Sequence, residues 1–95
     1  MESPRARRAL SVLRRRIDAL DCAVARLLSR RLRLVRALRP FKSRIPDPRR
    51  ELEVLANVGR QAGRSGAERE FVASVYRGLL RASRAFQKRE KRAGP

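Results

Sequence analysis

The sequence predicts an all-α fold: a protomer of three helices, one of them long and N-terminal, which pairs with a second copy as an intertwined homodimer. Apolar residues recur at the spacing of a helix face, and no segment alternates apolar and polar residues as a β-strand does. Two stretches rich in proline or glycine, residues 40–48 and 59–66, divide the 95 residues into three helical segments. This length fits one domain over 1–95, with ends that fray over about 1–6 and 89–95.

The first helix is expected over about residues 6–39, where a seam of apolar residues repeats at alternating steps of three and four and Pro40 opposes continuation. The seam consists of Leu10, Leu13, Ile17, Leu20, Val24, Leu27, Leu34 and Leu38. Arg31 fills the step between Leu27 and Leu34. A guanidinium at such a position is unfavourable without an opposite charge. Either a protein carboxylate or an anionic ligand must therefore pair with Arg31.

The length of the first helix predicts the homodimer. About 34 helical residues extend roughly 50 Å, whereas a compact domain of this size has a radius of gyration of about 13 Å. The helix therefore extends beyond its own domain, and its apolar seam continues along that extension. Burial against the same seam of a second copy is the simplest way to remove it from water.

The second helix is expected over about residues 48–61, with Asp47 as its N-cap and Pro48 at its first position. Asp47 is explained as well by this cap as by a role in a site. The tight connection that follows, around Gly63, separates the second helix from the third.

The third helix is expected over about residues 66–89, opened by a capping box of Ser65 and Glu68. Its apolar stripe of Val72, Tyr76 and Leu79 leads to the polar pair Ser83 and Gln87. These two residues lie four apart and face the side where apolar residues are expected. They indicate either a site or the polar end of a fraying helix.

The composition excludes several kinds of chemistry. One cysteine and no histidine rule out an internal disulfide, histidine-based triads and zinc sites, and no metal is expected. The glycines do not form a phosphate-binding loop. No signal peptide, membrane span or lipidation motif is visible, which predicts a cytoplasmic protein without a membrane partner.

A net charge of +17 raises nucleic-acid binding as a second class of function. All but three of the 26 basic residues are arginine, so a bias toward arginine would produce the same excess. The basic cluster at 5–16 overlaps the seam instead of preceding it, and only four residues are aromatic. These features disfavour nucleic acid as the partner. A basic nucleic-acid-binding helical dimer remains the non-enzyme alternative.

Three residue pairs place cations or hydrogen-bonding groups where core side chains are expected, the pattern of a site for a small dianion. The pairs are Arg14 with Arg31, Arg50 with Glu51, and Ser83 with Gln87. On one straight helix Arg14 and Arg31 would lie about 25 Å apart and face directions about 100° apart, too far to hold one small ligand. In an antiparallel dimer, Arg14 of one copy can approach Arg31 of the other. Each site would then be shared between two chains.

Five short motifs, in order, resemble the all-helical (type II) chorismate mutase family over about residues 10–88. They are LRRRIDALD (13–21), LLSRRL (27–32), FK (41–42), PDPRRE (46–51) and SRAFQ (83–87). The resemblance implies conversion of chorismate to prephenate for phenylalanine and tyrosine biosynthesis, by an intramolecular [3,3] rearrangement that needs no cofactor. It implies an isomerase that holds its substrate in the reactive conformer and stabilises developing charge.

The resemblance also implies a role for each site residue. Arg14 from the partner chain and Arg31 would bind the substrate carboxylates, assisted by Ser83. Lys42 and Gln87 would hydrogen-bond the ether oxygen of the breaking C–O bond. The remaining site residues are Asp47, Arg50, which holds the network, and Glu51, which binds the ring hydroxyl. The sequence departs from the family pattern at Pro40 and Phe41, which puts the aim of Lys42 in question.

Other activities occur on the same scaffold. It resembles isochorismate-pyruvate lyase and aminodeoxychorismate mutase, and the glutamate at Glu51 favours a mutase over a lyase. A further alternative is a weak mutase that gains activity by docking on an acidic partner enzyme of the same pathway. Without the resemblance, Arg14 and Arg50 are explained as solvated charges and Lys42 as a loop residue.

Overall fold

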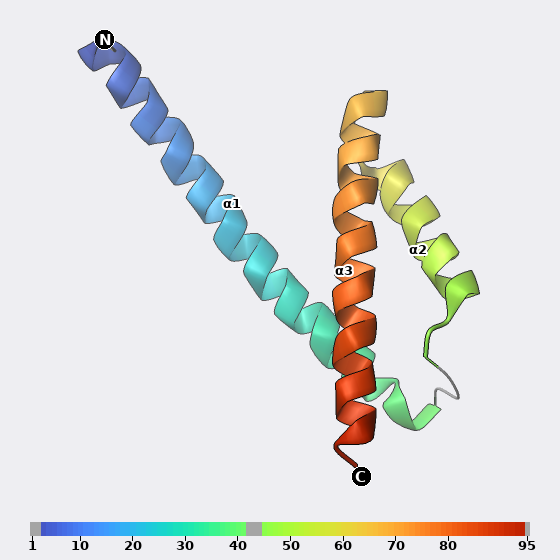
Figure 1. The fold of residues 1–95 in the computed structure, drawn as a ribbon. Helices are drawn as coiled ribbons and strands as arrows, with labels where there is room; N and C mark the ends of the chain where they lie inside the picture. The colour runs from blue at the N-terminus through green and yellow to red at the C-terminus, as the bar shows by residue number, and fades with distance from the viewer. Residues whose placement is uncertain (1–2, 42–44, 95) are drawn as a thin grey trace. The chain divides into compact units, whose positions relative to one another are not determined.

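The computed structural model describes residues 3–41 and 45–94, which are helical apart from short connections (Figure 1). In chain order the elements are the helix α1 (Pro4–Ala37), the 3-10 helix η1 (Arg39–Phe41), and the helices α2 (Pro48–Gln61) and α3 (Gly66–Arg92). No strand occurs in these residues, so the prediction of an all-α protomer with a long first helix is confirmed.

The chain divides into two compact units, Met1–Arg39 and Pro40–Pro95. The N-terminal unit consists of α1, and the C-terminal unit contains α2 and α3. The single domain expected over 1–95 stays a prediction. None of the helices in the described ranges combines the length and the apolarity that a membrane span requires.

α1 begins two residues earlier than expected and ends two residues earlier. Ser3 is its N-cap, and the Ser3 hydroxyl accepts a hydrogen bond of 3.1 Å from the backbone N–H of Ala6. The helix stops at Ala37, and the chain tightens into η1 at Arg39. Pro40 explains this end, because its ring disfavours the α conformation of the preceding residue and it has no N–H to continue the hydrogen-bond ladder.

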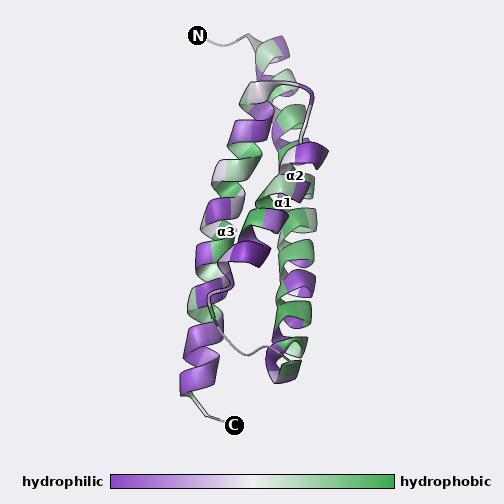
Figure 2. Cartoon of the chain, turned by 90° about the vertical axis from the view of Figure 1, so that its right-hand side faces the viewer, coloured by the Kyte–Doolittle hydropathy of each residue, from purple (hydrophilic) through white to green (hydrophobic). Residues whose placement is uncertain are grey.

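The apolar seam of α1 is exposed along its length in the single chain. Leu13 is 53% exposed, Leu20 65% and Leu34 70%, and α1 has no buried residue. Figure 2 shows hydrophobic residues recurring from one end of α1 to the other. A single helix cannot cover its own seam, so this face is open to a partner helix. The intertwined homodimer stays a prediction that this exposure favours.

α2 begins where the sequence predicts. Asp47 is the N-cap, with a carboxylate oxygen 3.2 Å from the backbone nitrogen of Arg50, and Pro48 opens the helix. The carboxylate satisfies one of the donors that the first turn leaves without an intrahelical partner. This cap fixes where the first turn of α2 starts, and Glu51 lies in that turn.

α3 also starts as predicted but continues further. The Ser65 hydroxyl accepts a 3.0 Å hydrogen bond from the backbone N–H of Glu68, which confirms the cap. The helix runs to Arg92, three residues beyond the expected end, with basic residues in its last turn that suit the helix dipole. α2 packs on α3 with antiparallel direction (Figure 1). Leu80 and Ser83 are the buried residues of α3.

Replacing Asp47 by alanine is expected to lower the free energy of unfolding by about 1 kcal/mol, because it removes the N-cap of α2. Asp47→Asn is the matched control and should stay within a few tenths of a kcal/mol of wild type, since asparagine caps about as well as aspartate. Urea denaturation measures both variants. Equal destabilisation by alanine and asparagine would show that the carboxylate charge, and not the cap, stabilises this end of the helix.

Candidate active site

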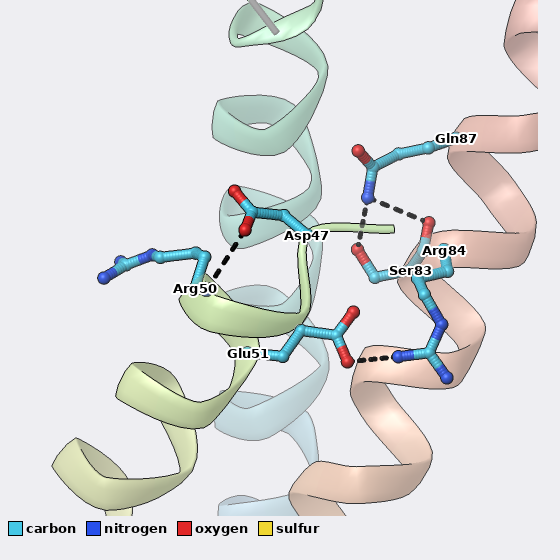
Figure 3. Close-up of polar contacts among 6 residues, drawn as sticks. All are labelled: Asp47, Arg50, Glu51, Ser83, Arg84 and Gln87. Atoms are coloured by element: carbon cyan, nitrogen blue, oxygen red, sulfur yellow. Dashed lines mark hydrogen bonds and ion pairs between the residues drawn. The ribbon is translucent and has the colours of Figure 1, made fainter. Parts of the chain in front are cut away.

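Four polar side chains from α2 and α3 form a cluster between the two helices, here called the α2–α3 cluster. Its members are Glu51, Ser83, Arg84 and Gln87 (Figure 3). Glu51 extends from the first turn of α2 toward α3, where Ser83 and Arg84 are neighbours and Gln87 lies one turn later. The antiparallel packing of the helices brings these residues together, although Ser83 follows Glu51 by 32 positions in the sequence.

Ser83 and Gln87 are linked by hydrogen bonds. The side-chain amide nitrogen of Gln87 lies 3.2 Å from both the backbone oxygen and the hydroxyl of Ser83. Ser83 is 8% exposed and Gln87 is half-buried. The prediction that this pair faces the side of the apolar stripe is therefore confirmed. Both hydrogen bonds are donated by the amide nitrogen of Gln87, so the two Ser83 oxygen atoms hold this amide in place.

Glu51 and Arg84 form an ion pair across the helix interface. The guanidinium of Arg84 donates to a carboxylate oxygen of Glu51, and the two side chains are 28% (Arg84) and 23% (Glu51) exposed. A partly desolvated pair interacts more strongly than one on the open surface. The sequence analysis did not identify Arg84, because nothing in the sequence distinguishes it from the other basic residues of the same helix.

Arg50 and Asp47 lie at the edge of the α2–α3 cluster. The Arg50 side chain extends away from α3 and pairs with Glu53 at 3.3 Å, and it is 62% exposed (Figure 3). The Asp47 carboxylate accepts the backbone N–H of Arg50 as the helix cap. The structure therefore brings Glu51, Ser83 and Gln87 together and does not join Arg50 to them.

The other candidate residues lie outside this unit. Arg14 and Arg31 are on one uninterrupted helix, α1, in the N-terminal unit. Neither side chain makes a hydrogen bond or an ion pair among the described residues, so the opposite charge that Arg31 requires is not supplied by its own helix. Lys42 lies outside the described residues.

The α2–α3 cluster offers a carboxylate, a hydroxyl, an amide and a guanidinium. These groups can bind and orient a polar ligand and place hydrogen-bond donors against developing negative charge. Histidine is absent from the sequence, and Cys22 is exposed on α1. No group of three acidic, cysteine or histidine residues suited to a metal ion occurs in the part of the chain that the structure describes.

The model of the family "Chorismate mutase type II" matches residues 13–88. The matched segment includes α1 from residue 13 onward, the complete α2, and α3 as far as residue 88, so it contains the α2–α3 cluster. No curated protein and no solved structure matches the chain. The family match agrees with the all-helical fold and covers most of the sequence. The chain belongs to the chorismate mutase type II family.

Proposed function

We propose that this protein is a chorismate mutase that converts chorismate to prephenate. The observation that carries the proposal is the family match over residues 13–88, a segment that contains every candidate site residue. The α2–α3 cluster supports it, because three of those candidates lie together between α2 and α3: Glu51, Ser83 and Gln87. As a pathway enzyme it would act in the cytoplasm in the biosynthesis of phenylalanine and tyrosine.

The proposed reaction is an intramolecular rearrangement that breaks a C–O bond and forms a C–C bond without transferring a proton. The enzyme needs to hold a flexible dianion in its compact conformer. Arginine suits this task, because its planar guanidinium binds a carboxylate through two parallel hydrogen bonds and stays charged. Arg31, with Arg14 of a second copy, would bind the two carboxylates, and the Ser83 hydroxyl would assist.

The remaining residues act at the ether oxygen and the ring. Gln87 and Lys42 would donate hydrogen bonds to the ether oxygen, where negative charge grows in the transition state. Glu51 would accept a hydrogen bond from the ring hydroxyl. Asp47 and Arg50 would complete the site at the start of α2.

The proposal includes the homodimer. The exposed seam of α1 needs a covering surface, and a second copy supplies one of the same length and periodicity. Dimerisation would also bring Arg14 of one chain to Arg31 of the other. The dimer would therefore complete the site as well as bury the seam.

The purified protein is expected to convert chorismate to prephenate in the presence of EDTA, at a rate nearly flat from about pH 6 to 9, because the reaction itself transfers no proton. Loss of chorismate and formation of prephenate are followed across that range. Isochorismate and 4-amino-4-deoxychorismate are tested in parallel, since they are the substrates of the lyase and of the aminodeoxychorismate mutase.

Conversion of isochorismate alone would assign the lyase activity instead, and preference for the amino compound would assign the aminodeoxychorismate mutase. A bell-shaped pH profile centred near neutrality would contradict the proposed mechanism, because it would reveal an essential acid and base.

A further inference from the structure

Glu51 presents an electrostatic problem if the proposed function is correct. Its carboxylate extends toward α3, the helix that carries Ser83 and Gln87, where a dianionic substrate would bind, and like charges repel strongly in a partly desolvated place (Figure 3). A carboxylate that is to accept a hydrogen bond from the ring must also be held in one orientation. Both requirements demand a cation that binds Glu51 from the side away from the substrate.

Arg84 meets these requirements. Its guanidinium donates to a carboxylate oxygen of Glu51 and comes from α3, the helix that also carries Ser83 and Gln87 (Figure 3). We infer that Arg84 is a positioning residue, which fixes the Glu51 carboxylate and offsets its charge so that Glu51 can bind the ring substituent of a dianion. This inference rests on the proposed function and assigns Arg84 no direct contact with the substrate.

The residues around Arg84 on α3 are also basic. It lines a groove of about 490 Å³ along α3 in which all the charged side chains are basic. The lining residues are Arg81, Arg84, Ala85, Lys88, Arg89 and Arg92. When Glu51 offsets the charge of Arg84, the other four cations still give this end of α3 a positive potential. Such a potential attracts a dianion toward the neighbouring cluster.

The pair could instead act only as a clamp between α2 and α3. A clamp changes stability and leaves the activity of each folded molecule unchanged, whereas a positioning residue changes activity through Glu51 alone. A double-mutant cycle separates the two roles. The variants are Arg84→Met, which keeps the length of the side chain without its charge, Glu51→Gln, and the combination of both. Activities are compared per folded molecule, at a temperature where circular dichroism shows each variant folded.

Arg84→Met is expected to lower kcat/KM for chorismate about 10-fold in the wild-type background and less than about 2-fold in the Glu51→Gln background. Arg84→Lys keeps the positive charge but lacks the planar guanidinium that donates two parallel hydrogen bonds, so its kcat/KM should lie between those of Arg84→Met and the wild type. Arg77→Met is the matched control. Arg77 pairs with Glu70 at 2.9 Å on the same helix, outside the cluster and more exposed, so kcat/KM should not change.

The positioning role would be overturned by equal losses of kcat/KM in the two backgrounds, or by no loss of activity in folded Arg84→Met. If the wild-type protein still converted chorismate, the proposed function would stand. Absence of turnover in the wild type would overturn the proposed function, and the positioning role with it. The two failures are therefore distinguished by the activity of the wild-type protein.

Discussion

Replacing Gln87 by alanine lowers kcat/KM for chorismate by about 10²-fold or more, the loss expected when a donor aimed at developing charge is removed. In the proposed mechanism negative charge grows on the ether oxygen, and the Gln87 amide is a neutral donor held in place before the reaction starts. Its nitrogen lies 3.2 Å from two oxygen atoms of Ser83, which keep the side chain in the α2–α3 cluster.

The variant should stay folded, because alanine favours a helix and Gln87 is not in the buried core. Arg77→Ala is the matched control: it removes a long polar side chain from an exposed position of α3 outside the α2–α3 cluster and the basic groove, and it should leave kcat/KM unchanged. Steady-state kinetics and circular dichroism measure both variants. A folded Gln87→Ala protein with wild-type kcat/KM would exclude Gln87 from the reaction.

Arg14→Ala and Arg31→Ala are each expected to be nearly inactive as homodimers, and a mixture of the two, unfolded and refolded together, should recover activity. The physical basis is α1, one continuous helix on which the two residues lie about 25 Å apart along the axis. They can serve one small ligand only from different chains. Each site would then combine Arg14 of one chain with Arg31 of the other.

The size of the recovery follows from the arrangement of the sites. Random refolding of equal amounts makes about half of the dimers mixed. In a mixed dimer one shared site receives both substitutions and the other receives neither, so about one quarter of all sites would be intact. Activity near that fraction of wild type is the expected result. If both arginines belonged to a site within one chain, every site would carry a defect and no activity would return.

Stability separates a binding role of Arg31 from a structural one. Arg31 interrupts the apolar seam of α1, so Arg31→Ala should be folded and as stable as wild type or more so. Size-exclusion chromatography and thermal unfolding of the single variants provide the control for the mixing experiment. A variant that loses the dimer but keeps its activity per folded molecule would make Arg31 an ion-pair residue of the dimer interface.

Features that depend on near neighbours in the chain could be predicted from the residue types alone. The caps at Asp47 and Ser65 use hydrogen bonds to a backbone three residues away, so the residue types alone predict them. The contact between Ser83 and Gln87 follows from the helical repeat, which places residues four apart on one face. The motifs also led to the chorismate mutase type II family, which the family match confirms.

The contacts across the two helices could not be predicted from the sequence. Symmetric folding about the connection at 62–65 would place Glu51 opposite about Tyr76, yet its carboxylate pairs with Arg84. The path of the connection and the packing of α2 on α3 set this offset between the helices, and both depend on side chains far apart in the sequence. Arg50 lies next to Glu51 in the chain but extends the other way, because neighbouring residues on a helix point about 100° apart. Sequence patterns report helices and their faces, whereas the register between two helices follows from how their surfaces fit together.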